Sequence, residues 1–97
     1  MRTGIETLRV IVADDNENMR RLLCGMLQSL GVTQIRQAAN GEEALASARH
    51  WRADIAFIDM QMGPVDGIAF TRQIRTAPGG ADPYLPIIML TGDAHRE

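Results

Sequence analysis

The chain has 97 residues, of which 45% are hydrophobic and 23% charged, and its formal net charge is −2. This length gives room for a single domain, and the small net charge predicts no direct contact with nucleic acid or anionic lipid. We expect a cytoplasmic protein, since no apolar run reaches membrane-spanning length, no signal-peptide core is present and Cys24 cannot form an intrachain disulfide.

Along the chain, short apolar runs alternate with stretches of helical periodicity. Strands are predicted over residues 8–13, 34–39, 53–58 and 85–90, and helices over 17–30, 42–51 and 67–77. The second strand has mixed polarity, which favours a sheet edge. This alternation predicts an α/β fold, a doubly wound parallel sheet of the flavodoxin-like kind with strand order 2-1-3-4.

The helix over 17–30 has the clearest pattern. Asn16 suits its N-cap and Gly31 its C-terminal end. Its apolar stripe predicts an amphipathic helix packed on the sheet and consists of Met19, Leu22, Leu23, Met26, Leu27 and Leu30. Arg20 and Arg21 are expected on the solvated side, and Cys24 off the stripe as a plain small residue. In the next helix, Trp51 is interpreted as a packing anchor and His50 as a solvated residue rather than a metal ligand.

Acids stand where the first and third strands end. Asp14 and Asp15 follow the first strand, and Asp59 follows the third. Adjacent strands lie about 4.8 Å apart, so we expect these carboxylates to converge at one edge of the sheet. An all-oxygen site without His or Cys favours Mg²⁺. Donors at Thr91 and Gly92, after the fourth strand, could bind an anion, and the set favours phosphoryl transfer onto Asp59.

With these motifs in order, the sequence resembles the receiver domain of two-component response regulators. The resemblance rests on the acid pair Asp14-Asp15, on Asp59 with the Asp66-Gly67 pair after it, and on the segment 87–92. It implies that Asp59 accepts phosphoryl from a histidine kinase or histidine phosphotransfer protein. It further implies a Mg²⁺ ion held by the side chains of Asp14, Asp15 and Asp59 and by the main-chain carbonyl of Gln61. The hydroxyl of Thr91 and the amide of Gly92 would contact the phosphoryl group, and movement of Thr91 would transmit the signal.

The sequence departs from the family pattern at two places. Family members usually have proline at the position of Gly63, whereas in this sequence the proline comes one residue later, as Pro64. The fifth strand with its lysine is also missing. All ten basic residues are Arg. We therefore expect residues 1–97 to be one receiver domain truncated before the fifth strand, with an output domain beyond residue 97. A fourth strand left at the edge predicts dimerisation or element exchange through residues 85–90.

Three other functions are weighed against this one. A degenerate receiver acting as a phosphorylation-independent binding module is favoured by the lack of lysine, though not by the intact acids. A Mg²⁺-dependent phosphatase resembling the haloacid dehalogenases would need an acid at Gln61, so we expect no enzyme acting on other substrates. Nucleotide binding lacks a glycine-rich phosphate loop after the first strand.

Overall fold

The computed structural model describes residues 4–76 and 83–90. In these ranges four parallel strands form one sheet in the order β2-β1-β3-β4, which confirms the predicted flavodoxin-like topology. The strands are β1 (Arg9–Ala13), β2 (Gln34–Ala38), β3 (Ile55–Asp59) and β4 (Ile87–Leu90). As predicted from its mixed polarity, β2 lies at an edge of this sheet. β4 begins two residues later than predicted, and the carbonyl of Pro86 before it accepts a hydrogen bond from the amide of Ala56 at 3.0 Å.

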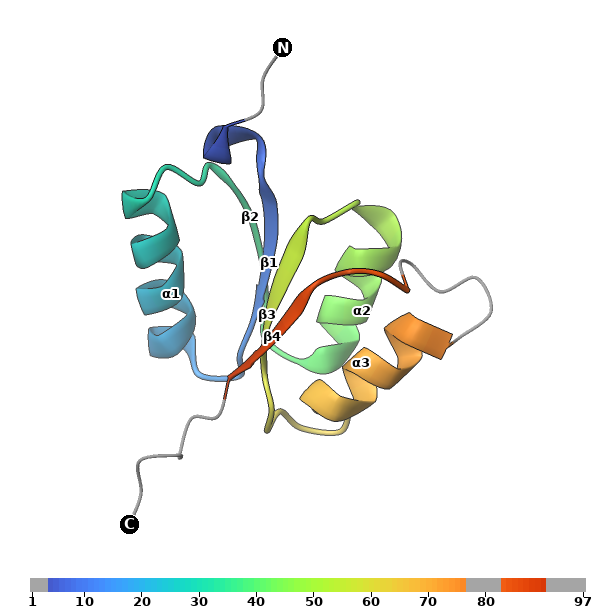
Figure 1. Ribbon diagram of the computed structural model, residues 1–97. Coiled ribbons are helices and arrows are strands. Elements are labelled where there is room, and N and C mark those ends of the chain that lie inside the picture. Colours follow the sequence, from blue (N-terminus) through green and yellow to red (C-terminus); the bar gives the residue numbers. More distant parts are fainter. Residues whose placement is uncertain (1–3, 77–82, 91–97) are drawn as a thin grey trace.

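Helices cover both faces of the sheet. In Figure 1, α1 (Glu17–Ser29) lies on one face, and α2 (Gly41–His50) and α3 (Gly67–Thr76) lie on the other. A short 3₁₀ helix, η1 (Ile5–Thr7), precedes β1 and was not predicted. Asn16 and Asn40 cap α1 and α2 through their side chains. Each helix of the described ranges is too short or too polar to span a bilayer.

The core is divided by the sheet into two clusters. The larger lies between the sheet and α2 with α3, and includes Ile11, Ile58 and Phe70, all fully buried. The smaller lies under α1 and includes Val10 and Val12. Because successive residues of β1 point to opposite faces, this strand contributes to both clusters. The β-branched residues Val10, Ile11 and Val12 are typical of a strand that is buried on both faces, and all three are fully buried.

The packing face of α1 differs from the prediction. Cys24 was placed off the apolar stripe, and this was wrong, because it is the buried residue of α1, at 7% exposure. Four apolar residues of the stripe are exposed, by 38%, 57%, 55% and 67% respectively: Met19, Leu22, Met26 and Leu30. The helix meets the sheet through the face that carries Leu23, Cys24 and Leu27. The apolar stripe is wider than the area the sheet covers, and periodicity could not show which half is in contact.

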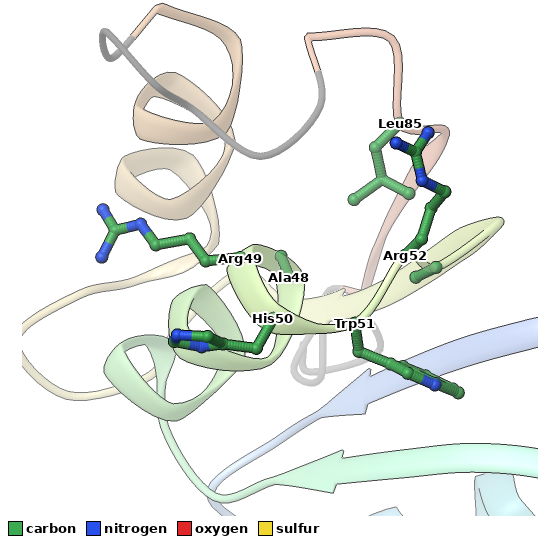
Figure 2. A pocket seen from close by; sticks show the side chains of 7 residues that line it. Ala48, Arg49, His50, Trp51, Arg52 and Leu85 are labelled. Carbon is green, nitrogen blue, oxygen red and sulfur yellow. The ribbon is translucent and has the colours of Figure 1, made fainter.

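Trp51 anchors the end of α2, as predicted. Its half-buried ring packs against the larger core cluster, and the guanidinium carbons of Arg36 and Arg9 lie 4.8 and 5.9 Å from the ring centroid. Beside it, at the amino edge of the sheet, is a shallow cavity of about 230 Å³. Figure 2 shows Arg49 and His50 directed away from Arg52 around this cavity, so its basic groups do not converge on a common point.

Candidate functional site

Three carboxylates meet at the carboxyl edge of the sheet. Asp14 follows β1 directly and Asp59 is the last residue of β3, and these two strands are parallel neighbours with Ala13 paired to Ile58. One carboxylate oxygen from each of Asp14, Asp15 and Asp59 lies within 4.8 Å of the others. Asp14 and Asp59 are buried and Asp15 is exposed. The three acids therefore converge as expected, and the group has one side toward solvent.

Asp14 is held at each of its polar groups. Its amide donates to the carbonyl of Ala38 at 3.1 Å, and its carboxylate accepts from the amide of Asn16 at 2.9 Å. Its main-chain carbonyl accepts from Nη1 of Arg20 at 2.7 Å. Asn16 in turn accepts from the amide of Met19 at 3.0 Å, which fixes the start of α1. The turn that carries both acids is thus tied to β2 and to α1.

Arg20 is a functional-site residue that the sequence reasoning missed. It was predicted to be solvated, but it is half-buried and also donates from Nε to the side-chain oxygen of Gln37 at 3.3 Å. Arg21 does behave as predicted, since it is exposed and, among the described residues, pairs with Glu17 one helical turn earlier, at 3.3 Å. The available signal was helical spacing, because Arg20 lies four residues before Cys24 and shares its face.

Asp59 is the buried acid of β3, at 9% exposure. Burial, and next the negative charges of Asp14 and Asp15, raise the pKa of its carboxyl above the ordinary value, while a hydrogen bond from the amide of Gln61 opposes this rise. That bond runs from the Gln61 amide to Oδ1 of Asp59 at 3.2 Å. The surroundings of Asp59 therefore stabilise the charged form of its carboxyl less well than water does.

The backbone at the end of β3 is fixed by α3 and β4. The amide of Met60 donates to the carbonyl of Leu90 in β4 at 2.8 Å, and the carbonyl of Met60 accepts from the amide of Gly67 at 3.1 Å. A Cβ at Gly67 would lie only 2.8 Å from the carbonyl oxygen of Asp59, so only glycine allows the start of α3 to come this close. Asp66 caps this helix by accepting from the amide of Ala69 at 2.8 Å.

The other predicted site residues are placed only in part. Gln61 is exposed and its amide contacts Asp59; the role of its carbonyl stays a prediction. Thr91 and Gly92 lie outside the described residues, directly after Leu90, which is the register partner of Asp59 in β4. Their roles likewise stay predictions.

The donor set fits a hard divalent cation. It offers carboxylate oxygens alone, from three acids whose oxygens are close enough to share one ion. Like charges at this separation raise one another's pKa values unless a cation lies between them. Few carboxylates with an open side suit Mg²⁺, which keeps several of its waters. Asp14, Asp15 and Asp59 could therefore hold such an ion.

Comparison with known proteins identifies the family. The model of the response regulator receiver domain matches residues 10–97. This chain belongs to the response regulator receiver domain family. The receiver is 32% identical over 90 residues to a protein-glutamate methylesterase/protein-glutamine glutaminase of Haloarcula marismortui, and 33% identical over 97 residues to the histidine kinase CKI1 of Arabidopsis thaliana. These alignments cover 93% and 87% of this chain, but only 22% and 9% of the relatives.

Solved structures place the receiver in the same family. The receiver domain of the sensor histidine kinase PA1611 from Pseudomonas aeruginosa PAO1, which has a magnesium ion coordinated in its active-site cleft, is 31% identical with a TM-score of 0.79. The match covers 92% of this chain and 70% of that one. The receiver domain of CKI1 complexed with Mg²⁺ and BeF₃⁻ is 32% identical with a TM-score of 0.79, and the match covers 90% and 69% of the two chains.

Proposed function

We propose that this receiver domain takes a phosphoryl group from a histidine kinase or histidine phosphotransfer protein onto Asp59, and thereby acts as a switch in two-component signalling. The observation that carries the proposal is the position of Asp59. It is buried at the end of β3, with carboxylate oxygens of Asp14 and Asp15 within 4.8 Å.

In this proposal Mg²⁺ is held by Asp14, Asp15, Asp59 and the main-chain carbonyl of Gln61. The bound ion would offset the negative charge of the acids and of the incoming phosphoryl group. The magnesium ion in the active-site cleft of the related PA1611 receiver supports this assignment. The role of Asp14 and Asp15 in this proposal is to hold that ion beside Asp59.

The transfer itself needs no other protein group to change covalently. A carboxylate oxygen of Asp59 forms a bond to the phosphorus of phosphohistidine, and the P–N bond breaks with its electron pair left on the imidazole nitrogen, which then takes a proton from solvent. The hydroxyl of Thr91 and the amide of Gly92 would contact the phosphoryl oxygens. We expect the domain to catalyse only this reaction and the hydrolysis of its own acyl phosphate.

The test uses a small acyl phosphate, acetyl phosphate, as phosphodonor and intact-mass spectrometry as readout. With Mg²⁺, the wild-type chain should gain the mass of one phosphoryl group, and chelation of the metal should prevent this. Asp59→Asn should stay unmodified, while Asp54→Asn, which changes an exposed acid at the opposite edge of the sheet, should behave as wild type. Equal modification of Asp59→Asn and wild type would refute the assignment of the acceptor.

We also propose that the chain is one module of a longer protein with a separate output domain. The support is that it spans 22% of the length of one curated relative and 9% of another. The reading frame around the coding sequence tests this, since it should continue into a further domain. A cytoplasmic location is proposed with it, in keeping with the free, buried thiol of Cys24.

A second candidate function is a binding module that works without phosphorylation. The observation in its favour is the loop after Asp59, where Gly63 takes the place of the proline that family members usually carry. Addition of beryllofluoride, a phosphoryl mimic, together with Mg²⁺ discriminates the two functions. Unchanged amide spectra and an unchanged hydrodynamic radius would favour the binding module, and a shift in either would favour the switch.

A further inference from the structure

Arg20 joins three elements at the acid-bearing edge of the sheet. Its side chain leaves the second turn of α1, donates from Nη1 to the carbonyl of Asp14 at 2.7 Å after β1, and donates from Nε to Gln37 of β2 at 3.3 Å. Both acceptors are uncharged oxygens. Arg20 therefore links α1 to the ends of β1 and β2 through two hydrogen bonds from its rigid guanidinium group, and does not pair with a carboxylate in these two contacts.

We propose that Arg20 is a positioning residue that sets the direction of the Asp15 carboxylate for metal binding. The inference rests on the proposed function and adds to it a residue for which no role was expected. The claim is specific: Arg20 contributes to Mg²⁺ affinity through the geometry of the turn between β1 and α1, and not through its charge.

The physical link is the peptide plane between Asp14 and Asp15. The carbonyl that accepts from Arg20 and the amide nitrogen of Asp15 belong to the same planar unit, so rotation of that carbonyl also rotates the start of Asp15. The other hydrogen bonds of Asp14, from its amide to Ala38 and to its carboxylate from Asn16, involve groups that do not belong to this peptide unit. Exposed Asp15 is thus the acid whose direction depends most on the bond from Arg20.

Loss of this bond has a cost that the turn can relieve only by moving. The carbonyl of Asp14 follows residues 10–13 of β1, which are fully buried, and a carbonyl left without a partner in such a place is unfavourable. Rotation toward water would recover a partner and would turn Asp15 away from Asp14 and Asp59. Residues that hold metal ligands in this manner typically change metal affinity by about 10–100-fold when replaced.

The sign of the effect separates geometry from charge. A positive side chain near a Mg²⁺ site repels the ion, so removal of the charge alone should tighten binding. Loss of the two hydrogen bonds that Arg20 donates should instead weaken Mg²⁺ binding. Arg21 offers the matched control, since it is the next residue of the same helix, carries the same charge and, within residues 4–76 and 83–90, pairs with Glu17 at the surface.

The experiment measures Mg²⁺ affinity by isothermal titration calorimetry in wild type, Arg20→Met, Arg20→Lys and Arg21→Met. We expect Arg20→Met to bind about 10–100-fold more weakly, Arg20→Lys to recover only part of the affinity because it lacks the second fixed donor, and Arg21→Met to bind as wild type or slightly more tightly. Thermal midpoints establish that each variant folds. If Arg20→Met does not fold, Arg20→Lys carries the comparison.

A second readout needs no metal. In the metal-free protein, Arg20→Met should shift the amide resonances of residues 14–16 well beyond the shifts seen in Arg21→Met. Wild type that binds no Mg²⁺ would refute the proposed function, and the amide comparison would then decide the positioning role alone. Wild type that binds Mg²⁺, with Arg20→Met binding as tightly, would overturn the positioning role and leave the proposed function intact.

Discussion

The contact between Gly67 and the end of β3 predicts the outcome of a one-methyl change. In Gly67→Ala, the new Cβ would lie 2.8 Å from the carbonyl oxygen of Asp59, 3.0 Å from Cα of Met60 and 2.6 Å from Sδ of Met89. The methionine sulfur can move aside because it is near the end of a flexible side chain. The two backbone atoms cannot, since they belong to the strand end that carries Asp59.

The size of the effect follows from these distances. Ordinary Cβ contacts begin at 3.4 Å, so α3 and the end of β3 must separate by about 0.6 Å at the Asp59 carbonyl. Overpacking of this kind costs about 1–3 kcal/mol, and the better helix propensity of alanine returns at most about 1 kcal/mol. We therefore expect Gly67→Ala to lose about 1–2 kcal/mol of the free energy of unfolding. Because the shift is centred on Asp59, phosphorylation by acetyl phosphate should fall as well.

Gly25→Ala is the matched control, because it also adds one methyl to a helix but meets no atom within 4 Å. It should raise the free energy of unfolding by about 0.5–1 kcal/mol and leave phosphorylation unchanged. Urea denaturation followed by circular dichroism measures both variants. The reasoning would be refuted by Gly67→Ala that is as stable as Gly25→Ala and reacts at the wild-type rate.

Three further predictions concern other parts of the molecule. Burial and neighbouring carboxylates raise the pKa of Asp59 above 3.8, so the folded state binds a proton at this carboxyl more tightly than the unfolded state does. The free energy of unfolding should therefore fall as the pH rises from 3.8 toward the higher pKa of the folded state. Asp59→Asn should thus be more stable than wild type at neutral pH without Mg²⁺, and the gain should fall toward zero as the pH is lowered below 3.8 in urea titrations; a constant gain would contradict this. At the β4 edge of the described sheet, Ile88 is 43% exposed, so we expect association at micromolar concentration that Ile88→Lys reduces, measured by size-exclusion chromatography with light scattering; a monomeric wild type would argue against it. Trp51→Leu removes the ring on which two arginines stack and should cost about 1–2 kcal/mol in thermal unfolding, whereas an unchanged midpoint would show that the stacking contributes nothing.

Much of the fold could be predicted because it depends on patterns local in sequence. The β-branched run of β1, the side-chain cap at Asn16 and the alternation of strands and helices are such patterns. The limits of the elements differed by one or two residues, since the ends depend on hydrogen bonds to other segments. The bond between Ala56 and Pro86, just before β4, is an example.

The candidate site was predicted in kind because parallel strand ends share one edge. Once β1 and β3 are neighbours, Asp14, Asp15 and Asp59 must lie near one another. Arg20 could not be assigned in the same way. The residue that shares the buried face of α1 with Arg20, four positions later, is Cys24. The apolar pattern did not predict that Cys24 is buried.

The sequence by itself determined the succession of strands and helices along the chain, the acids at the strand ends and the residue types that suit Mg²⁺, because each depends on periodicity or on the chemistry of single side chains. Only the tertiary structure decided which face of α1 meets the sheet, that Arg20 reaches the Asp14 carbonyl while Arg21 stays in solvent, and that α3 leaves no room for a Cβ at Gly67. These features depend on the distances between elements far apart in the chain. Such distances are set by how all the side chains pack together, and no local pattern contains that information.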